Sequence, residues 1–310
     1  MPPTLPTIVV AGSAIMDLVI HAPRQPRVGE TVIGSDFGMY LGGKGANQAA
    51  AAARLGGRVT FVGCVGADPF GEQFRRSFAA EGIDARFVVT DARLGTGVGM
   101  PEIYPDGQNS IVIAPQANMA LTPAHVEAAA EEIRAAAVLL FQLEIPLDAV
   151  QRAVEIAHAA GVCVIGNPAP ARPLPDELLA RVTWLVPNEA EAEQLSGVRV
   201  VDDASAERAA LALLARGPRY VAITRGAAGA TLVSADACRH VPAFPVDPVD
   251  TTGAGDAFCG ALAVALARGT DPVDAVRFAN AAGALATTVV GAQPSMPRAA
   301  QIAALMLPGG

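Results

Sequence analysis

The segment Val249–Phe258 carries the strongest chemical signal of the chain. It reads Val-Asp-Thr-Thr-Gly-Ala-Gly-Asp-Ala-Phe and leads into a predicted helix of small residues over 257–267. Gly253, Ala254 and Gly255 place several backbone N–H groups at a helix N-terminus, where the helix dipole also favours an anion. The pattern therefore predicts a phosphate cradle.

Asp256 stands in the first turn of this predicted helix. A carboxylate at such a position can simply cap the helix. An acid beside a phosphate cradle also repels the bound anion unless it has a chemical task, and taking a proton from an attacking hydroxyl is such a task. We therefore favour Asp256 as a general base over a capping residue, with the 253–256 N–H groups as an anion hole.

A second glycine-rich segment, Leu41–Gln48, precedes a run of alanines. Its three glycines would let backbone N–H groups approach a ligand, although a tight strand-to-helix turn explains them equally well. Residues 38–45 nearly match a P-loop, but Gly45 replaces the Ser or Thr that would bind magnesium, which excludes that site. Lys44 is the only lysine among 22 basic residues, and this indicates a need for a compact ammonium group or a narrow space at this position.

Two weaker patterns follow apolar runs that resemble strands. Asn188 and Glu191 share one face of a predicted first helical turn, where they could organise Mg²⁺ through water or simply cap the helix. The segment Thr224–Gly229 could hold a nucleotide or form a hairpin turn.

The elements that would position these residues alternate after about residue 120. Apolar runs at 138–142, 162–166, 183–187 and 219–223 alternate with helical stretches near 123–136, 147–160, 189–196 and 205–215. This rhythm predicts an α/β fold with a mostly parallel sheet, whose ligands bind beyond the carboxyl ends of the strands.

The first third of the chain differs from this pattern. Short strands at 17–20, 31–33, 37–41, 97–104 and 109–113 predict a small separate sheet. We expect it to form a lid from about 15–41 and 96–114. Helices near 46–55 and 69–80, with a strand at 59–64, belong to the main body of one domain spanning 1–310.

The composition of the chain argues against some classes of function. The chain has 310 residues, 52% of them hydrophobic, and a net charge of −8. This charge argues against a nucleic-acid partner, and the apolar stretches are shorter than the roughly 20 residues of a membrane span. We expect a soluble, cytoplasmic protein, since the first residues lack the pattern of a signal peptide. Its four cysteines form no CxxC motif, and we expect them to be buried rather than to bind zinc or form disulfides.

Together the motifs resemble the ribokinase family of PfkB-type sugar kinases over essentially the whole chain. Segments 42–48 and 250–256 look like the two family signatures, and 167–171 and 187–193 are typical of its ribokinase members. The resemblance implies a central, mostly parallel sheet flanked by helices, with a small β-sheet lid through which two subunits commonly pair. It also implies ATP-dependent phosphorylation of D-ribose at the 5-hydroxyl, with Asp256 as the base.

The resemblance further implies roles for individual residues. The sugar-binding residues would be Asp17, Gly42, Gly43, Lys44, Asn47, Glu144 and Asp256. The nucleotide-binding residues would be Asn188, Thr224, Arg225, Gly226, Ala227, Ala228, Gly229, Gly255 and Asn280. Glu191 would help to order Mg²⁺ through water. A K⁺ ion would be held by Asp250, by Ser295 and by backbone oxygens of Thr252, Ala286, Val289 and Gly291.

Two departures from the family pattern bear on which substrate the protein binds. Ile15 stands where many members have Asn, and the lid strand contains Met100 and Pro101. Proline removes a ladder donor and belongs on a sheet edge or at a bulge. A kinase for deoxyribose, another sugar or a nucleoside therefore remains the alternative. A dinucleotide-dependent oxidoreductase would need GxGxxG after the first strand, which residues 8–14 lack. A non-catalytic sugar-binding protein would not need Asp256 in the cradle.

Overall fold

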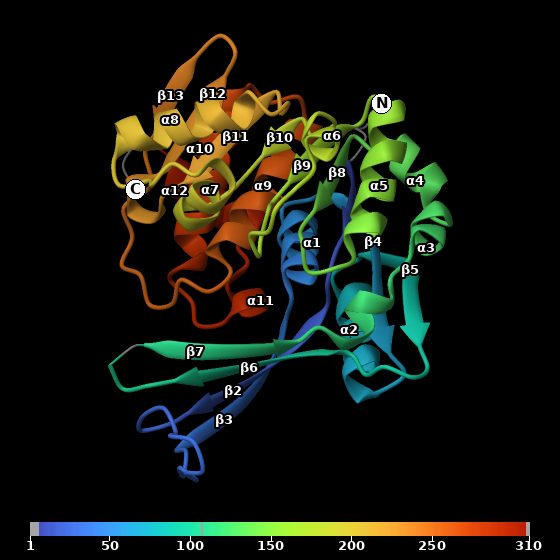
Figure 1. The fold of residues 1–310 in the computed structure, drawn as a ribbon, viewed down its shortest axis with the longest axis vertical. Coiled ribbons are helices and arrows are strands. Elements are labelled where there is room, and N and C mark those ends of the chain that lie inside the picture. Colours follow the sequence, from blue (N-terminus) through green and yellow to red (C-terminus); the bar gives the residue numbers. More distant parts are fainter. Residues whose placement is uncertain (1–5, 107, 308–310) are drawn as a thin grey trace.

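The structure is a computed structural model that describes residues 6–106 and 108–307 (Figure 1). Residues 1–5 and 308–310 of the expected domain, and position 107 of the expected lid, lie outside the described residues.

A nine-stranded sheet forms the centre of the main body, in the order β13-β12-β11-β10-β9-β8-β1-β4-β5. The strands are β1 (Thr7–Ala11), β4 (Arg58–Gly66), β5 (Asp84–Asp91), β8 (Val138–Phe141), β9 (Cys163–Gly166), β10 (Trp184–Leu185), β11 (Tyr220–Thr224), β12 (Ala230–Ser234) and β13 (Cys238–Val241). Neighbouring strands from β5 to β11 pair in parallel, whereas β12 and β13 add an antiparallel end. The mostly parallel sheet is confirmed.

Helices cover both faces of this sheet. One face carries α1 (Lys44–Arg54), α2 (Pro69–Ala80), α9 (Ala254–Ala267), α10 (Pro272–Ala286) and α12 (Ala299–Met306). The other carries α3 (Pro123–Glu127), α4 (Ala130–Ala135), α5 (Leu147–Ala159), α6 (Asp176–Leu179), α7 (Glu189–Ser196) and α8 (Asp203–Leu214). Along β1, Ile8 and Val10 enter the first core while Val9 and Ala11 enter the second, as the two-residue period of a strand requires.

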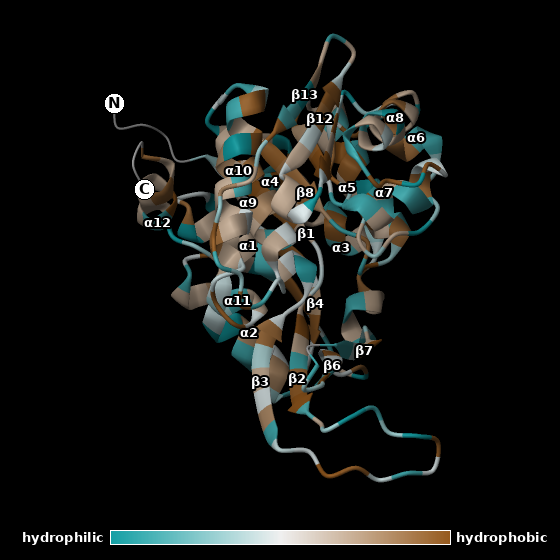
Figure 2. Ribbon diagram, turned by 90° about the vertical axis from the view of Figure 1, so that its left-hand side faces the viewer, coloured by the Kyte–Doolittle hydropathy of each residue, from teal (hydrophilic) through white to brown (hydrophobic). Residues whose placement is uncertain are grey.

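A separate four-stranded sheet, the lid, projects from the main body (Figure 1). Its order is β3 (Asp36–Gly42), β2 (Ile15–His21), β6 (Gly97–Ile103) and β7 (Asn109–Ala114). Figure 2 shows brown, apolar stretches on its strands outside the main body. The segment 31–33 is not a strand, contrary to the prediction. It lies in the exposed connection between β2 and β3, where Ile33 is 88% exposed and nothing covers its apolar side chain.

The lid is fixed to the main body at its base by Asn118, which is fully buried in η1 (Gln116–Ala120). Its Oδ1 accepts the N–H of Ala14 at 2.9 Å, and its Nδ2 donates to the carbonyls of Ala14 and Pro115 at 2.9 and 3.0 Å. A Cβ at Gly97, the first residue of β6, would lie 2.4 Å from Nδ2, so glycine leaves room for this amide.

Other predictions of local structure were partly wrong. The helix expected over 123–136 is broken into α3 and α4, because Ala129 leaves helical geometry. Pro101 lies in an interior strand and not on an edge of the lid. The pairing of β6 with β2 skips Leu18 and Val19, which is where the N–H group that Pro101 lacks would have been needed.

Cys64 and Cys259 are buried, whereas Cys163 and Cys238 are partly exposed, and all four are free thiols. No helix within 6–106 and 108–307 is long and apolar enough to cross a membrane.

Candidate active site

Close packing of α9 against α1 builds the centre of the site. A Cβ at Gly260 would lie 2.6 Å from the Ala51 Cβ and 2.8 Å from the Gln48 carbonyl oxygen, so only glycine lets the helices approach this closely. The approach brings Asp256, in the first turn of α9, against the side chains of Asn47 and Gln48 on α1.

Asp256 is 6% exposed, and both of its carboxylate oxygens accept hydrogen bonds from amides. Asn47 Nδ2 donates to Oδ2 at 2.9 Å, and Gln48 Nε2 donates to Oδ1 at 2.9 Å. No side chain caps the N-terminus of α9. The carboxylate is therefore directed at α1 and does not satisfy the backbone of its own helix, which removes the capping explanation.

The start of α9 has the geometry of an anion site. Gly253 has φ 80°, a conformation that favours glycine, and a Cβ there would lie 2.8 Å from Met296 Cε. A Cβ at Gly255 would meet no atom within 4 Å, so internal packing does not require glycine at that position. Gly255 lines two pockets, and the space beside it would accept a phosphate.

Glu144 is oriented from the main body. Its Oε2 accepts the Ser13 hydroxyl and the backbone N–H of Lys44, the latter at 2.9 Å. Burial raises the pKa of Glu144, while Lys44 and these hydrogen bonds oppose that rise. Since Oε2 already has two donors, Oε1 is the oxygen that remains for a ligand hydroxyl.

Asp17 approaches the same place from the lid. Its carboxylate lies against the backbone of two neighbouring strands, because a Cβ at Gly42 would be 2.1 Å from Oδ2 and one at Gly99 would be 2.4 Å from Oδ1. Burial, and then the charges of Glu144 and Asp256, raise the pKa of Asp17 from 3.8 to about 6. The lid strand thus carries Gly99 because any larger side chain would displace Asp17.

Lys44 and Asn47 complete the set expected to bind sugar. Burial alone would lower the pKa of Lys44, but the charges of Asp256, Glu144 and Glu191 raise it. Asn47 Oδ1 is buried and lacks a hydrogen-bond partner within the described residues. A buried acceptor without a donor is costly, which suits an oxygen that meets a ligand hydroxyl.

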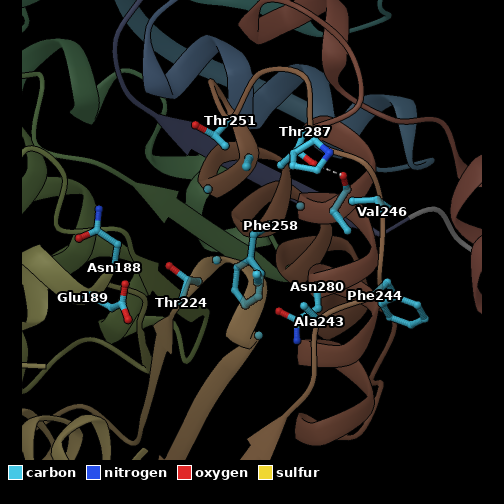
Figure 3. Close-up of a pocket in the computed structure, with 18 of the residues that line it drawn as sticks. Asn188, Glu189, Thr224, Ala243, Phe244, Val246, Thr251, Phe258, Asn280 and Thr287 are labelled. Carbon is cyan, nitrogen blue, oxygen red and sulfur yellow. Dashed lines mark hydrogen bonds between the residues drawn. The ribbon is translucent and has the colours of Figure 1, made fainter. Parts of the chain in front are cut away.

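A pocket of about 880 Å³ lies beside the start of α9 (Figure 3). Seven of the residues expected to bind nucleotide line it, namely Asn188, Thr224, Gly226, Ala227, Gly229, Gly255 and Asn280. The sequence reasoning missed its apolar wall, which includes Ala243, Phe244, Pro245, Val246, Pro248 and Phe258. Only the proline-rich composition of 242–248 could have indicated it, since that segment lacks a helix or strand period.

A smaller pocket of about 200 Å³ adjoins the first one. It contains Lys44, Glu191 and Asp256, and it shares Asn188, Thr224, Thr251 and Gly255 with the larger pocket. The base candidate, the anion site and the lone lysine therefore meet at one end of the apolar pocket.

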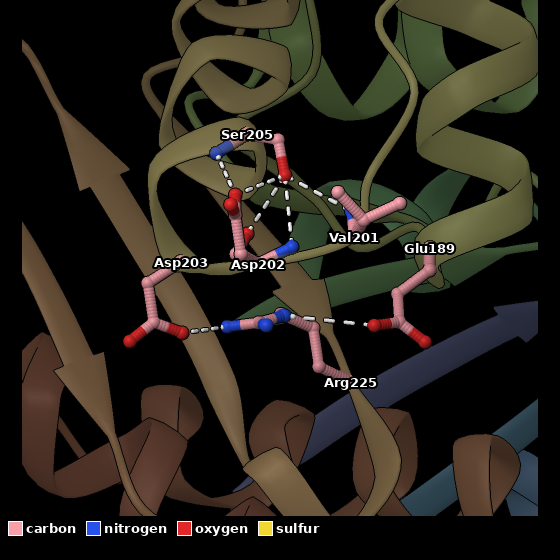
Figure 4. A network of polar contacts seen from close by, with 6 residues as sticks. All are labelled: Glu189, Val201, Asp202, Asp203, Ser205 and Arg225. Atoms are coloured by element: carbon pink, nitrogen blue, oxygen red, sulfur yellow. Dashed lines mark hydrogen bonds and ion pairs between the residues drawn. The ribbon is translucent and has the colours of Figure 1, made fainter.

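Arg225 and Ala228 are not among the residues that line the larger pocket, so their contact with a nucleotide stays a prediction. The Arg225 side chain is 6% exposed and forms ion pairs with Asp203, at the start of α8, and with Glu189, at the start of α7 (Figure 4). The turn η2 (Gly226–Ala228) that follows it joins the antiparallel strands β11 and β12. This segment is thus both a hairpin turn and one wall of the pocket, and Arg225 fixes it to two helices.

The remaining predicted ligands occupy two places. Asn188 and Glu191 form a capping box on α7, with reciprocal bonds of 2.8 Å. The other Glu191 carboxylate oxygen accepts no hydrogen bond from the described residues, and Glu191 lines the smaller pocket together with Asp256. Asp250 accepts the N–H groups of Thr252 at 2.9 Å and Gly291 at 2.8 Å. It therefore joins the two segments, 250–252 and 286–295, that contain the predicted K⁺ ligands.

Sequence reasoning also missed four polar residues, Ser13, Gln48, Asn167 and Gln142. Gln48 and Asn167 lay within noted motifs, but their contacts did not follow from the motifs. Gln142 gave no local signal, because its partner Gln48 is 94 positions away.

Comparisons with known proteins agree with this arrangement. Residues 5–299 match the pfkB family carbohydrate kinase model. The chain is 42% identical to a ribokinase of Haemophilus influenzae, covering 94% of this chain and 95% of that protein. It is 36% identical to a deoxyribokinase of Salmonella typhi, with 94% and 95% coverage. The structure of Arabidopsis thaliana ribokinase complexed with ribose and ATP superposes with a TM-score of 0.92 at 34% identity, covering 97% of this chain and 99% of that one.

The raised pKa of Asp17 predicts that Asp17→Asn stabilises the protein at alkaline pH. The folded state binds the Asp17 proton more tightly than the unfolded state, so the ionised carboxylate lowers stability increasingly as pH rises from 3.8 to about 6. We expect urea unfolding at pH 8 to show a gain of up to about 3 kcal/mol for Asp17→Asn, shrinking to about 1 kcal/mol at pH 4.5. The control is the exposed Asp236→Asn. An equal gain at both pH values would contradict the assignment.

Proposed function

The chain belongs to the pfkB family of carbohydrate kinases, and from that premise we propose that it transfers the terminal phosphoryl group of ATP to the 5-hydroxyl of D-ribose. The product is ribose 5-phosphate. The observation that carries the proposal is the position of Asp256. This buried carboxylate lies in the first turn of α9, beside the anion site, and it contacts Asn47, one of the residues that could hydrogen-bond a sugar hydroxyl.

In the proposed reaction, Asp17, Asn47 and Glu144 orient the sugar through its hydroxyl groups. Asp256 then takes the proton of the attacking hydroxyl, and the N–H groups of 253–256 stabilise the charge on the transferred phosphoryl group. The apolar pocket takes the adenosine of ATP, with Asn280 and the 226–229 turn at its wall. Magnesium would neutralise phosphate charge, and the free oxygen of Glu191 suits a water-mediated contact with it. We place this reaction in the cytoplasm, where ATP is available.

A second candidate substrate is deoxyribose, because the buried Ile15 offers no polar group to a sugar and a deoxyribokinase is among the relatives. The lid gives no support for a nucleoside through Met100. Strand register places Asp17 opposite Gly99, so the side chain of the next residue, Met100, points to the other face of the lid.

We expect ribose to give the highest kcat/KM when ADP release is compared for ribose, 2-deoxyribose, fructose and adenosine. A site that pairs each hydroxyl discriminates against an analogue lacking one, because its own polar groups are left unpaired. A higher value for adenosine or fructose would refute the ribose assignment, and a higher value for 2-deoxyribose would favour the second candidate.

The matched control for this assay is Asp256→Asn. It keeps the shape but removes the proton acceptor, so kcat should fall about 10²- to 10⁴-fold while the KM for sugar changes little. Near-normal kcat in the folded variant would exclude Asp256 as the base.

We also propose a K⁺ site formed by Asp250, Ser295 and backbone oxygens of Thr252, Ala286, Val289 and Gly291. Its support is the bridge that Asp250 makes between Thr252 and Gly291, directly before the anion site. A carboxylate with several neutral oxygens suits a large, weakly hydrated cation. By fixing 250–252, the ion would hold the N–H groups of 253–256 in place.

Potassium should therefore raise kcat relative to equal concentrations of sodium or tetramethylammonium. Asp250→Asn should reduce this activation, whereas Val289→Ala should retain it, because Val289 would contribute only its carbonyl. The same rate in rigorously potassium-free buffer would refute the site.

We further propose that two copies of the chain pair through the lid. The face opposite Asp17 exposes Ile20, Phe37, Met39, Met100 and Val112, with exposed fractions of 36–70%. A clustered apolar surface of this kind is typical of an interface between proteins.

Sedimentation velocity should detect a dimer of the wild type at micromolar concentration and a monomer of Met39→Arg, since a buried unpaired charge opposes association. The control Leu211→Arg changes an equally exposed residue on α8 and should remain dimeric. A monomeric wild type would overturn the proposal.

A further inference from the structure

Behind Asp256 lies a chain of buried amides to which the proposed reaction assigns no task. Gln48 and Gln142 are both 0% exposed, and Asn167 is 8% exposed. Buried amides are mostly hydrogen-bonded, and of these three residues only Gln142 has a buried polar atom, Oε1, without a partner within the described residues. The hydrogen bonds that connect them therefore show what the chain of amides can do.

Each bond of the chain has a defined direction. Gln48 Nε2 donates to Asp256 Oδ1 at 2.9 Å and to Asn167 Oδ1 at 3.0 Å. Gln48 Oε1 accepts from Gln142 Nε2 at 2.6 Å. Asn167 Nδ2 in turn donates to the Val186 carbonyl at 2.9 Å, so Asn167 must present its oxygen to Gln48.

These directions leave the Gln48 amide one orientation. If it rotated by 180°, its oxygen would face the oxygens of Asp256 and Asn167, and its NH₂ would face the donor group of Gln142. Two satisfied bonds to acceptors would become two repulsive contacts in a dry interior. Asp256 and Asn167 therefore require Gln48 to act as a donor, and Gln142 supplies the N–H group that the remaining Gln48 oxygen needs in this orientation.

The backbone makes room for this arrangement. A Cβ at Gly12 would lie 2.2 Å from Gln142 Oε1 and 2.7 Å from the Gly45 Cα. Any side chain at Gly12 would thus displace the Gln142 amide, and with it the bond to Gln48. The glycine after β1 and the amide after β8 fit together at the carboxyl ends of adjacent strands.

We propose that Gln48 is a positioning residue for Asp256, and that Gln142 acts through Gln48 by donating to the oxygen of its amide. Gln48 binds Oδ1 from the buried side. Oδ2 accepts from Asn47, whose own buried Oδ1 has no partner within the described residues and is expected to meet a sugar hydroxyl. We therefore assign to Oδ2 the proton of the attacking hydroxyl. The inference rests on the proposed role of Asp256 as the base.

A double-mutant cycle with Gln48→Met and Gln142→Met tests this proposal. Both changes remove an amide with little change of shape. We expect Gln48→Met to lower kcat roughly 10- to 100-fold with less than about a threefold change in either KM, because only the reacting geometry is lost. Gln142→Met should lower kcat less. The double variant should be no slower than Gln48→Met alone, because Gln142 acts only through Gln48.

Stability is followed in parallel by thermal unfolding. The control Phe78→Leu removes a fully buried ring that packs on Phe61 and Phe74, on the α2 side of the sheet. It should lower Tm while leaving kcat unchanged, which separates loss of stability from loss of positioning. If Gln48→Met does not fold, Gln48→Asn replaces it, since its shorter amide keeps the polarity but withdraws the donor.

Unchanged kcat in the Gln48 variant, a loss confined to KM, or independent kcat losses in the double variant would each overturn the proposal. These outcomes are read against a wild type that phosphorylates ribose and an Asp256→Asn variant whose kcat is at least about 10²-fold lower. Absence of ribose phosphorylation by the wild type would instead refute the proposed function, and near-normal kcat of Asp256→Asn would refute the role of its base.

Discussion

The close approach of α9 to α1 is the constraint on which the rest of the site depends. Gly260 permits it, and the surrounding contact surface consists largely of alanines that are fully buried. Larger side chains would separate the helices and withdraw Asp256 from its amide partners. This explains why so hydrophobic a chain is only 5% aromatic. Its core gains order from short distances between helices rather than from large side chains.

The electrostatics of the site follow from that geometry. Glu144, Asp256 and Glu191 bring three carboxylates around one ammonium group, Lys44. Asp17 adds a fourth carboxylate beside Glu144 and Asp256. Such a cluster is unfavourable for the isolated protein, and burial raises the pKa of Asp17, Glu144 and Glu191. The stored repulsion is relieved when hydroxyl donors and cations enter, so the site is organised for its ligands at the expense of stability.

The sequence predicted those features that depend on residues close to one another in the chain. The spacing of Gly253, Gly255 and Asp256 indicated a cradle with an acid beside it, and alternating runs indicated the parallel sheet. Contacts between residues far apart in the chain could not be predicted from the sequence. Gln142 meets Gln48 only because β8 and β1 are neighbours in the sheet, and Arg225 is paired because α7 and α8 both present acids to it. The two short helices α3 and α4 read as one, since an alanine-rich segment gives no signal for a break.

Asn118 has a mechanical consequence. Asn118 hydrogen-bonds both the N–H and the C=O of Ala14 and so fixes the base of the lid, which would act as a hinge. Asp17 lies on the lid only three residues beyond this hinge. Glu144 and Asp256 lie on the main body, on the other side of that hinge. Any swing of the lid therefore changes the separation between the two halves of the sugar site. If Asp17 and Glu144 bind one sugar as proposed, that sugar connects the lid to the main body, and the substrate itself would hold the lid closed.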